Sequence, residues 1–211
     1  MRVIEPYTEI CSDVDGKEIL EKIELCGRVC YKSESRIAEG SAEKFVANII
    51  KRGHEAVLEH ASITVKFVVD RGVSHEIVRH RIASYCQEST RYCNYSKDDF
   101  GSEITFIKPF YLDADTDGWG IWCEAMQACE DAYFELLDFG CTPEEARAVL
   151  PNSLKTELVM TANLREWRAF FKLRTSKAAH PQMREVARPL LEKMQKLVPV
   201  VFDDITYQYE W

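Results

Sequence analysis

Apolar residues along this chain recur at two spacings, one typical of helices and one typical of strands. Between residues 14 and 31, Ile19, Ile23, Cys26 and Cys30 follow at steps of three or four, which predicts a helix with one buried side. Between residues 63 and 69 every second residue is apolar, which predicts a strand with one buried face. The chain therefore combines both kinds of element.

The same spacings, together with cap and stop residues, predict the other elements. Further helices are expected over residues 41–53, from 74 to about 78, and over 119–139, 142–150, 164–174 and 182–197, the last one interrupted or kinked at Pro189. Strands are expected over residues 104–107 and 154–162. The candidate helix caps are Ser41, Ser74, Thr142 with Glu145, and Asn163, and the candidate stops are Gly53 and Gly140.

No repeat, low-complexity tract or linker interrupts this order of elements. A chain of 211 residues with 46% hydrophobic content can bury a core of its own, and this length favours one domain over two. We therefore predict an α+β fold, with a mixed sheet and flanking helices in a single domain that spans residues 1–211.

Charge and hydropathy exclude several classes of protein. No apolar run approaches the roughly 18 residues of a membrane helix, and the first residues lack the apolar region of a secretory signal. A formal net charge of −8 and a pI near 5.3 argue against a general nucleic-acid binder, because such binding depends on a basic face. The sequence predicts a cytoplasmic protein without nucleic-acid or membrane partners.

The eight cysteines contain no C-x-x-C pair, the usual knuckle of a structural zinc site. Without a secretory signal they are expected to be reduced thiols, most of them small apolar fillers on helix faces. Cys86 lies inside the arginine-rich segment described next, but no base adjoins it in sequence. A packing role is therefore favoured for Cys86 over a nucleophilic one.

The segment RHRIASYCQESTR, residues 79–91, runs against the acidic character of the chain. It holds three arginines and a histidine, opposed only by Glu88. Arginine binds phosphate and carboxylate oxygens two at a time, and Ser84, Gln87 and Ser89 add hydrogen-bonding groups. A solvated, ion-paired surface is the plain alternative. On chemistry alone the segment fits a nucleotide site and a charged surface about equally well.

Other chemistries are poorly supported by the residue spacing. His54 and His60 lie six apart, and His75 and His80 lie five apart, whereas a helical zinc pair needs a gap of four. His54 and His75 are expected to be polar surface or capping groups, and no metal site is predicted. Glycine-rich phosphate loops are also missing. If the protein binds a dinucleotide, its side chains must hold the phosphates.

The arginine segment also resembles a known family signature. Arg79-His80-Arg81, seven residues, Ser89 and then Arg91 is similar to the motif of the flavin-dependent thymidylate synthases. The resemblance extends upstream to residues 60–62 and downstream to residues 147–151, 163–165 and 173–174. These anchors span residues 60–174, so the match is not confined to one short motif.

The resemblance implies an activity, a cofactor and an assembly. By this resemblance, the chain would form a homotetramer of α+β subunits with active sites at the subunit interfaces. They bind FAD, reduce it with NADPH, and make dTMP from dUMP with 5,10-methylenetetrahydrofolate as the carbon donor. The partners implied for this chain are therefore dUMP, folate and NADPH.

Residue roles carried over from the family divide into two sets. The implied dUMP contacts are Glu76, Arg79, Gln87, Ser89, Thr90, Arg91, Arg147 and Arg174. The implied FAD contacts are His60, Ser62, Arg79, His80, Arg81, Asn163 and Arg165. Arg91 and Arg147 would clamp the phosphate of dUMP, and His60 would lie beside flavin and folate. Ala169 stands where relatives often place Asn or His against the flavin, and no role is assigned to His180 or Gln182.

Arg174 carries the implied catalytic role. A fixed cation beside the pyrimidine would favour ionisation at N3 and make C5 more nucleophilic, without a covalent bond to the enzyme. The chain has no Pro-Cys dipeptide, the context of the nucleophile in the folate-only thymidylate synthases. Two other hypotheses are a nucleotide-sensing or phosphate-binding protein without turnover, and a metal hydrolase, against which the histidine spacing weighs.

Overall fold

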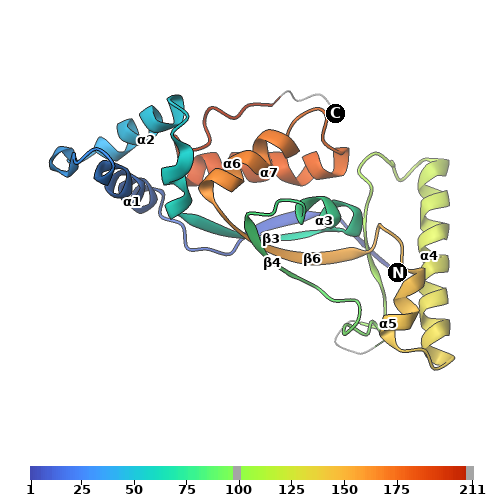
Figure 1. Cartoon of the computed structure of the whole chain (residues 1–211). Coiled ribbons are helices and arrows are strands. Elements are labelled where there is room, and N and C mark those ends of the chain that lie inside the picture. Colours follow the sequence, from blue (N-terminus) through green and yellow to red (C-terminus); the bar gives the residue numbers. More distant parts are fainter. Residues whose placement is uncertain (97–100, 208–211) are drawn as a thin grey trace. The chain divides into compact units, whose positions relative to one another are not determined.

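The computed structural model describes residues 1–96 and 101–207 (Figure 1). Its α-helices are α1 (Gly16–Val29), α2 (Ser41–Lys51), α3 (Arg71–Ile77), α4 (Asp117–Asp138), α5 (Pro143–Ala146), α6 (Leu164–Arg174) and α7 (Pro181–Leu197). Short 3-10 turns are η1 (Glu34–Arg36), η2 (Glu55–His60) and η4 (Arg147–Val149). The strands are β1 (Arg2–Ile4), β2 (Tyr7–Ile10), β3 (Ser62–Asp70), β4 (Ala83–Gln87), β5 (Thr105–Ile107) and β6 (Lys155–Asn163).

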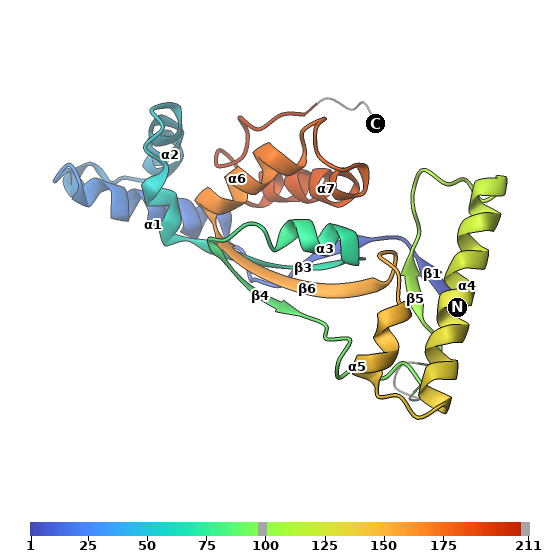
Figure 2. The ribbon, with the colours of Figure 1, turned by 45° about the vertical axis from the view of Figure 1, so that its right-hand side comes forward.

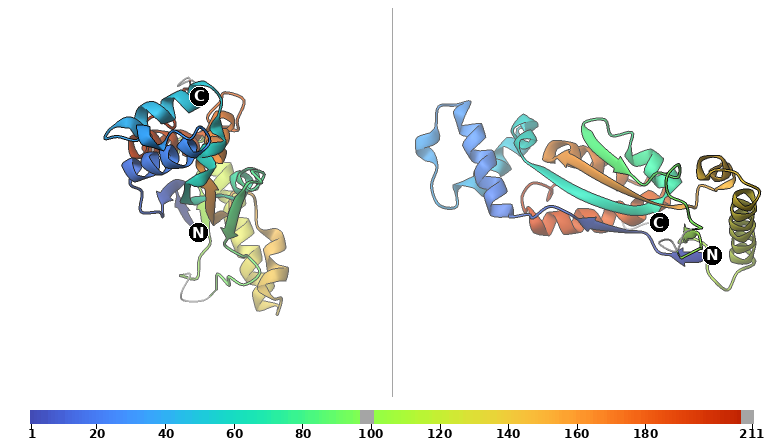
Figure 3. Two further views of the ribbon diagram at one scale, coloured as in Figure 1. Left: turned by 60° about the vertical axis from the view of Figure 1, so that its left-hand side comes forward. Right: turned by 90° about the horizontal axis from the view of Figure 1, so that it is seen from below.

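The strands form two sheets. A four-stranded sheet has the order β2-β3-β6-β4, and its strands appear as adjacent arrows in Figure 3. The smaller sheet pairs β1 with β5 in parallel, with Val3 opposite Phe106. Every second residue of β6 is buried, as the sequence alternation predicts.

The chain packs into two compact units. The first unit consists of Met1–Tyr7, Phe67–Arg79 and Cys86–Val159, and the second of Thr8–Lys66, His80–Tyr85 and the chain from Met160 onward. Strands β3, β4 and β6 each have residues in both units. The sequence prediction of one domain over residues 1–211 therefore stays a prediction.

The first unit is built around α4 and the small sheet (Figure 2). Its core cluster consists of Tyr95, Ile104, Phe106, Met126, Tyr133, Ala146 and Leu154. The carboxylate of Glu130, buried on α4, accepts a hydrogen bond from the Ile104 amide at 2.6 Å and pairs with the amino terminus at 2.8 Å. One side chain thus fixes both β1 and β5 to the helix.

The second unit has an aromatic core on α6. Trp167 stacks on Phe171 with ring centroids 5.8 Å apart, and Phe171 meets Phe202 edge to face. The indole of Trp167 donates to the Ile63 carbonyl at 3.0 Å, which joins α6 to β3. These aromatic side chains bury large apolar areas and set the position of the helix that carries Arg165 and Arg174.

Most predicted elements are present at the expected positions. The capping pair at the start of α5 is formed, because the Glu145 carboxylate accepts from the Thr142 amide at 2.8 Å. Asn163 caps α6 by accepting from the Glu166 amide at 2.9 Å. Gly53 and Gly140 have φ of +70° and +101° just after their helices, which explains why glycine ends them. Pro189 does not interrupt α7, which continues to Leu197.

Two of the predicted caps are wrong. Helix α2 begins at Ser41 itself, and the Ser41 hydroxyl donates to Glu24 at 2.6 Å instead of capping the helix. Helix α3 is capped by Asp70, which accepts from the Val73 amide at 2.8 Å, so Ser74 lies inside the helix. In α3 an acidic residue supplies the cap one turn earlier, and in α2 the Ser41 hydroxyl donates to an acidic residue of α1.

The arginine segment and the cysteines also differ from expectation. Residues 83–87 form strand β4, which is not among the strands expected from the sequence. All eight cysteines are free thiols, but none is fully buried, and Cys11, Cys30 and Cys86 are exposed. The prediction that Cys86 packs as a small filler is therefore wrong, because alternate residues of β4 point to an open face. Among residues 1–96 and 101–207, no helix is long and apolar enough to cross a membrane.

Candidate functional site

Several of the implied site residues lie in the first unit, and one of them is Gln87 at the end of strand β4. The Gln87 amide donates to the hydroxyls of Ser74 at 3.0 Å and Thr156 at 3.3 Å. Ser74 and Thr156 are both buried. Helix α3 and strand β6 thus fix the side chain of Gln87 and leave its carbonyl oxygen available as an acceptor.

The turn after β4 brings two arginines to one place. Arg147 donates from Nη1 to the Thr90 hydroxyl at 3.1 Å, and Thr90 is buried. Arg91 donates from Nε to the Glu144 carboxylate at 2.8 Å. Arg147 also donates to the Glu144 carbonyl at 3.2 Å, so both arginines are anchored to the start of α5. Both stay exposed, which leaves guanidinium nitrogens for an anionic ligand.

Glu88, the one acid of the arginine segment, is occupied elsewhere. Its carboxylate accepts from Lys155 and from the Tyr95 hydroxyl, each at 3.0 Å. Burial is the main cause that raises the pKa of Tyr95, and the charge and hydrogen bond of Glu88 raise it further. Glu88 therefore serves the fold of this turn. Arg91 pairs with Glu144 instead, and Arg147 has no carboxylate partner among the described residues.

Helix α3 supplies two further implied site residues, Glu76 and Arg79. Glu76 is half-buried and Arg79 is exposed just beyond the end of the helix. The division between the two units falls inside the Arg-His-Arg motif, with Arg79 in the first and His80 and Arg81 in the second. The implied dUMP residues other than Arg174 thus belong to the first unit, and the implied FAD residues other than Arg79 belong to the second.

In the second unit, His80 links a carboxylate to Arg174. The His80 Nδ1 lies 2.9 Å from the Glu166 carboxylate, and Arg174 Nε donates to His80 Nε2 at 3.1 Å. His80 and Arg174 are 8% and 9% exposed, and the imidazole packs on Phe170 with centroids 5.0 Å apart. This chain of three groups holds a buried guanidinium in one orientation.

The hydrogen bonds determine the protonation state of His80. Because Arg174 can only donate, Nε2 must be unprotonated, and the proton lies on Nδ1 and is donated to Glu166. Burial lowers the pKa of His80 most strongly, the hydrogen bond that it donates to Glu166 raises it, and the charge of Arg174 lowers it. The net direction is downward, so His80 is neutral near pH 7.

Tyr85 completes this group from strand β4. Its hydroxyl donates to the His80 carbonyl, and burial with the nearby charge of Glu166 raises the pKa of Tyr85 to about 12. Tyr85 is therefore a hydrogen-bond donor at neutral pH and no proton acceptor. It fixes the backbone of the Arg-His-Arg motif.

We expect nitrogen-15 NMR to show His80 as the Nδ1–H tautomer with a pKa below the ordinary 6.5. Replacing Glu166 with glutamine should lower this pKa further, because a charge that favours the imidazolium is lost. The folded-state pKa lies below the unfolded one, so the unfolded chain binds the proton more readily. The free energy of unfolding should therefore decrease as pH falls from 6.5 toward the folded pKa. An imidazole that titrates above 6.5 would contradict this arrangement.

The other implied FAD residues in the second unit are mostly exposed. Arg165 pairs with Glu59, with Nη1 2.6 Å from the carboxylate. This hydrogen bond, and after it the charge of Glu59, raises the pKa of Arg165. His60, Ser62 and Arg81 are exposed. Asn163 is partly buried and its side-chain oxygen is used in capping α6, so its amide nitrogen is the group left for a ligand. Ala169 is exposed on α6.

Several residues that organise these clusters were missed by reasoning from the sequence. Glu166 orients His80, Glu144 anchors Arg91, and Glu59 pairs with Arg165. Glu166 and Glu144 lie in the first turns of α6 and α5, where acids also complement the helix dipole, whereas Glu59 lies near the end of η2. Of these three carboxylates, only Glu166 stands in a recognisable sequence pattern, Asn163-x-x-Glu166. This pattern indicates a helix cap and does not indicate that Glu166 is the partner of His80.

The described residues contain no group of three His, Cys, Asp or Glu side chains suited to a metal ion. The residues assembled in each unit instead suit anions. Arginines with free nitrogens bind phosphate oxygens, and a buried guanidinium can stabilise negative charge that develops on a bound ring.

Comparison with known proteins identifies both the fold and the family of this chain. The solved structure of the UMP/dUMP methylase PolB from Streptomyces cacaoi, bound with 5-Br dUMP, shares the fold with a TM-score of 0.80 and 23% identity over 96% of both chains. The family model described as thymidylate synthase complementing protein matches residues 14–200.

Relatives of known name extend over most of the chain. The flavin-dependent thymidylate synthase of Geobacter sulfurreducens is 36% identical over 86% of this chain and 80% of its own length. That of Pyrococcus furiosus is also 36% identical, over 92% of this chain and 80% of its own length. The chain belongs to the family of flavin-dependent thymidylate synthases. The resemblance seen in the sequence and the α+β fold class are therefore confirmed.

Proposed function

We propose that this protein is an FAD-dependent thymidylate synthase that makes dTMP from dUMP. The carbon donor is 5,10-methylenetetrahydrofolate, the reductant is NADPH, and no enzyme nucleophile forms a covalent bond to the substrate. The observation that carries the proposal is the buried Arg174, held by His80 and Glu166 in a chain of this family. The substrate named for the Streptomyces methylase supports the choice of dUMP.

The dUMP residues are those clustered in the first unit. Arg91 and Arg147 bind the phosphate, with Thr90 and Ser89 as hydrogen-bonding neighbours. Gln87, fixed by Ser74 and Thr156, offers its carbonyl oxygen to the base. Glu76 and Arg79 complete this set. Each proposed contact uses an acceptor or donor that the fold has already placed.

The residues of the second unit fit a flavin dinucleotide by their chemistry. Arg81 is exposed and has no ion-pair or hydrogen-bond partner among the described residues, so its guanidinium is free for a phosphate. Ser62, Arg165 and Asn163 add donors, and the exposed His60 imidazole lies at the edge of a largely apolar hollow. His80 belongs to the same proposed set, although both of its ring nitrogens are engaged with protein groups. When bound, FAD supplies the redox chemistry of the reaction.

Arg174 is the catalytic residue of the proposal. Its charge stabilises the negative charge that develops on the pyrimidine as C5 becomes nucleophilic. His80 is a positioning residue, because its unprotonated Nε2 accepts from Arg174 Nε and fixes the orientation of the guanidinium group. Ser89 accepts from the Arg91 amide at 3.3 Å and has no neighbouring base, so it acts as a hydrogen bonder.

The remaining parts of the proposal concern assembly and setting. The enzyme is a homotetramer with active sites at subunit interfaces, built from a single domain that spans residues 1–211. NADPH and folate are its other partners. The cytoplasmic location and the absence of nucleic-acid and membrane partners stay predictions from the sequence.

The proposal is tested by colour and turnover. Purified protein should be yellow or take up FAD, and it should oxidise NADPH faster when dUMP is added, with dTMP appearing only when methylenetetrahydrofolate is present. Protein that stays colourless and ignores FAD would refute the proposed function. Protein that binds dUMP and FAD without forming dTMP would support the nucleotide-binding alternative.

Replacing Arg147 with alanine should raise the KM for dUMP about 10- to 100-fold, because a charge-assisted hydrogen bond contributes roughly 1.5–3 kcal/mol. Turnover at saturating dUMP should change much less, since the phosphate lies away from the reacting carbon. Steady-state kinetics with dUMP as the varied substrate measures both values. As a control, Glu135→Ala removes an exposed side chain of α4 and should leave both constants unchanged. A fall in kcat without a change in KM would contradict the phosphate role.

A further inference from the structure

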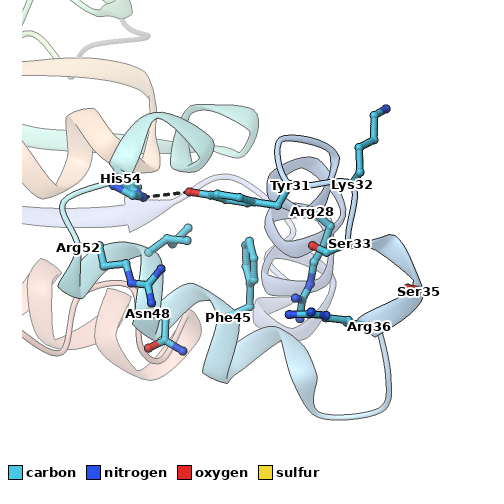
Figure 4. Close-up of a pocket in the computed structure, with 11 residues that line it drawn as sticks. Arg28, Tyr31, Lys32, Ser33, Ser35, Arg36, Phe45, Asn48, Arg52 and His54 are labelled. Atoms are coloured by element: carbon cyan, nitrogen blue, oxygen red, sulfur yellow. Dashed lines mark hydrogen bonds between the residues drawn. The ribbon is translucent and has the colours of Figure 1, made fainter.

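A second hollow in the second unit lies outside the residues assigned above and is lined by cations. This α1–α2 pocket has a volume of about 490 Å³ and is drawn with its 11 lining residues in Figure 4. The lining residues are Arg28, Tyr31, Lys32, Ser33, Ser35, Arg36, Phe45, Asn48, Ile49, Arg52 and His54. They include three arginines and one lysine but no Asp or Glu, in a chain of formal net charge −8.

Arg28 forms a fixed wall of this pocket. Its guanidinium donates to the buried Glu24 carboxylate at 2.6 and 3.0 Å and lies 4.7 Å from the centre of the Phe45 ring. Glu24 also accepts from Ser41 at 2.6 Å. The charge of Arg28 is therefore cancelled locally, and its role is to hold Phe45 and the two helices in place.

Arg36 and Arg52 are different, because no carboxylate cancels them. Both are exposed, and neither side chain has an ion-pair or hydrogen-bond partner in the parts of the chain that the structure describes. Arg36 comes from η1 and Arg52 follows α2, and Figure 4 shows them on either side of Phe45. Two uncompensated guanidinium groups thus face one pocket from two different elements.

The other lining groups favour a ligand with a ring as well as anionic groups. Tyr31 and His54 close one side of the pocket, with the Tyr31 hydroxyl 3.3 Å from His54 Nδ1. An adjoining hollow of about 410 Å³ shares Tyr31, Phe45, Ile49 and His54 with the α1–α2 pocket and extends to His60. Cations thus line the α1–α2 pocket, and apolar and aromatic side chains line the adjoining hollow toward His60.

We propose that the α1–α2 pocket binds the phosphate or carboxylate groups of a small elongated ligand, through Arg36 and Arg52. Guanidinium groups bind such oxyanions two atoms at a time and are well matched to partly exposed sites. The ring portion of the ligand lies in the adjoining hollow beside Tyr31 and Phe45. No residue among those lining the pocket repels an anion.

Two ligands of the proposed reaction have this chemistry. NADPH carries phosphate groups, and methylenetetrahydrofolate ends in a glutamate tail that bears carboxylates. This choice between co-substrates rests on the proposed function, whereas the binding of oxyanions by the pocket does not. The two statements can therefore fail separately.

Calorimetric titration with inorganic pyrophosphate and with tri-γ-glutamate tests the pocket directly on the full chain. The double variant Arg36→Ala/Arg52→Ala should bind at least one of these probes about 10-fold or more weakly than the unchanged protein. Lys51→Ala is the matched control, because Lys51 is an exposed cation on α2 beside Arg52 and does not line the pocket. Equal affinity in all three proteins, or no binding of either probe, would overturn the proposal.

Steady-state kinetics then distinguishes the two sources of oxyanions. If the pocket binds NADPH, the double variant raises the KM for NADPH and leaves that for folate unchanged; if it binds the folate tail, the reverse holds and the effect grows with triglutamate folate. An unchanged KM for both overturns the assignment to these co-substrates. A protein that binds pyrophosphate but makes no dTMP would refute the proposed function while supporting the pocket.

Discussion

Replacing Arg174 with alanine is expected to lower the rate of dTMP formation by about 10²- to 10³-fold. Removing a preorganised donor that stabilises developing negative charge has this effect in other enzymes. Arg174 is buried and donates to His80 at 3.1 Å, so its charge is already held in place. A cation from the surface could take this position only if the surrounding side chains moved. Both kcat and kcat/KM for dUMP should fall together, because the interaction strengthens as the ring becomes negative.

Two further variants separate this chemical role from a structural one. Arg174→Lys keeps the charge and should retain more activity than the alanine variant, although it loses the guanidinium geometry. Lys172→Ala removes an exposed cation of the same helix and should turn over dUMP normally. Flavin absorbance of each variant checks that it is folded and loaded. An alanine variant that binds FAD and keeps more than a tenth of the activity would exclude Arg174 as the catalytic residue.

Local patterns in the sequence predicted the elements that carry the site. The alternation over 154–162 matches β6, and Asn163 caps α6 as its position before an amphipathic stretch indicates. The capping pair of Thr142 and Glu145 begins the short helix α5 next to Arg147. These features succeed because each depends on residues within a few positions of one another.

Partners far apart in the sequence could not be predicted in this way. Glu166 lies 86 residues from His80, and nothing local indicates that it orients the imidazole. Ser41 looked like a cap, but its hydroxyl binds Glu24, 17 residues away. Strand β4 was missed for a similar reason, because Ala83–Gln87 is polar and its strand conformation comes from pairing with β6. Tertiary contacts, which no local pattern reports, decide all three.

Buried arginines are the clearest example of this limit. In the sequence Arg165, Arg168 and Arg174 look alike, yet the first is exposed and the other two are almost fully buried. A charged side chain is buried only where hydrogen-bond acceptors are available to it, and here these acceptors come from distant segments of the sequence. The difference between a catalytic, a structural and a surface arginine on α6 is therefore a property of the fold.

The second large effect is expected on stability, from Arg168→Ala. Arg168 is 1% exposed, and its nitrogens donate to Asp204 at 2.6 and 2.8 Å, to Glu55 at 3.0 and 3.3 Å, and to the Val201 carbonyl. Truncation leaves these acceptors unpaired and opens a cavity, so we expect the free energy of unfolding to fall by about 3–5 kcal/mol. Since small proteins are stable by only roughly 5–15 kcal/mol, thermal unfolding should shift by many degrees.

The matched control and the pH dependence identify the cause of this loss. Arg165→Ala on the same helix breaks an exposed pair with Glu59 and should change the free energy of unfolding by less than about 1 kcal/mol. The hydrogen bond from Arg168 is the main cause that lowers the pKa of Asp204 below 3.8, so its contribution is present above that pH and is lost as pH falls through the folded pKa. The stability difference between wild type and Arg168→Ala should therefore shrink in acid, as urea unfolding at a series of pH values would measure. A difference that stays constant down to the acid limit would assign the loss to packing around Trp167 and Phe171 and not to the ion pairs.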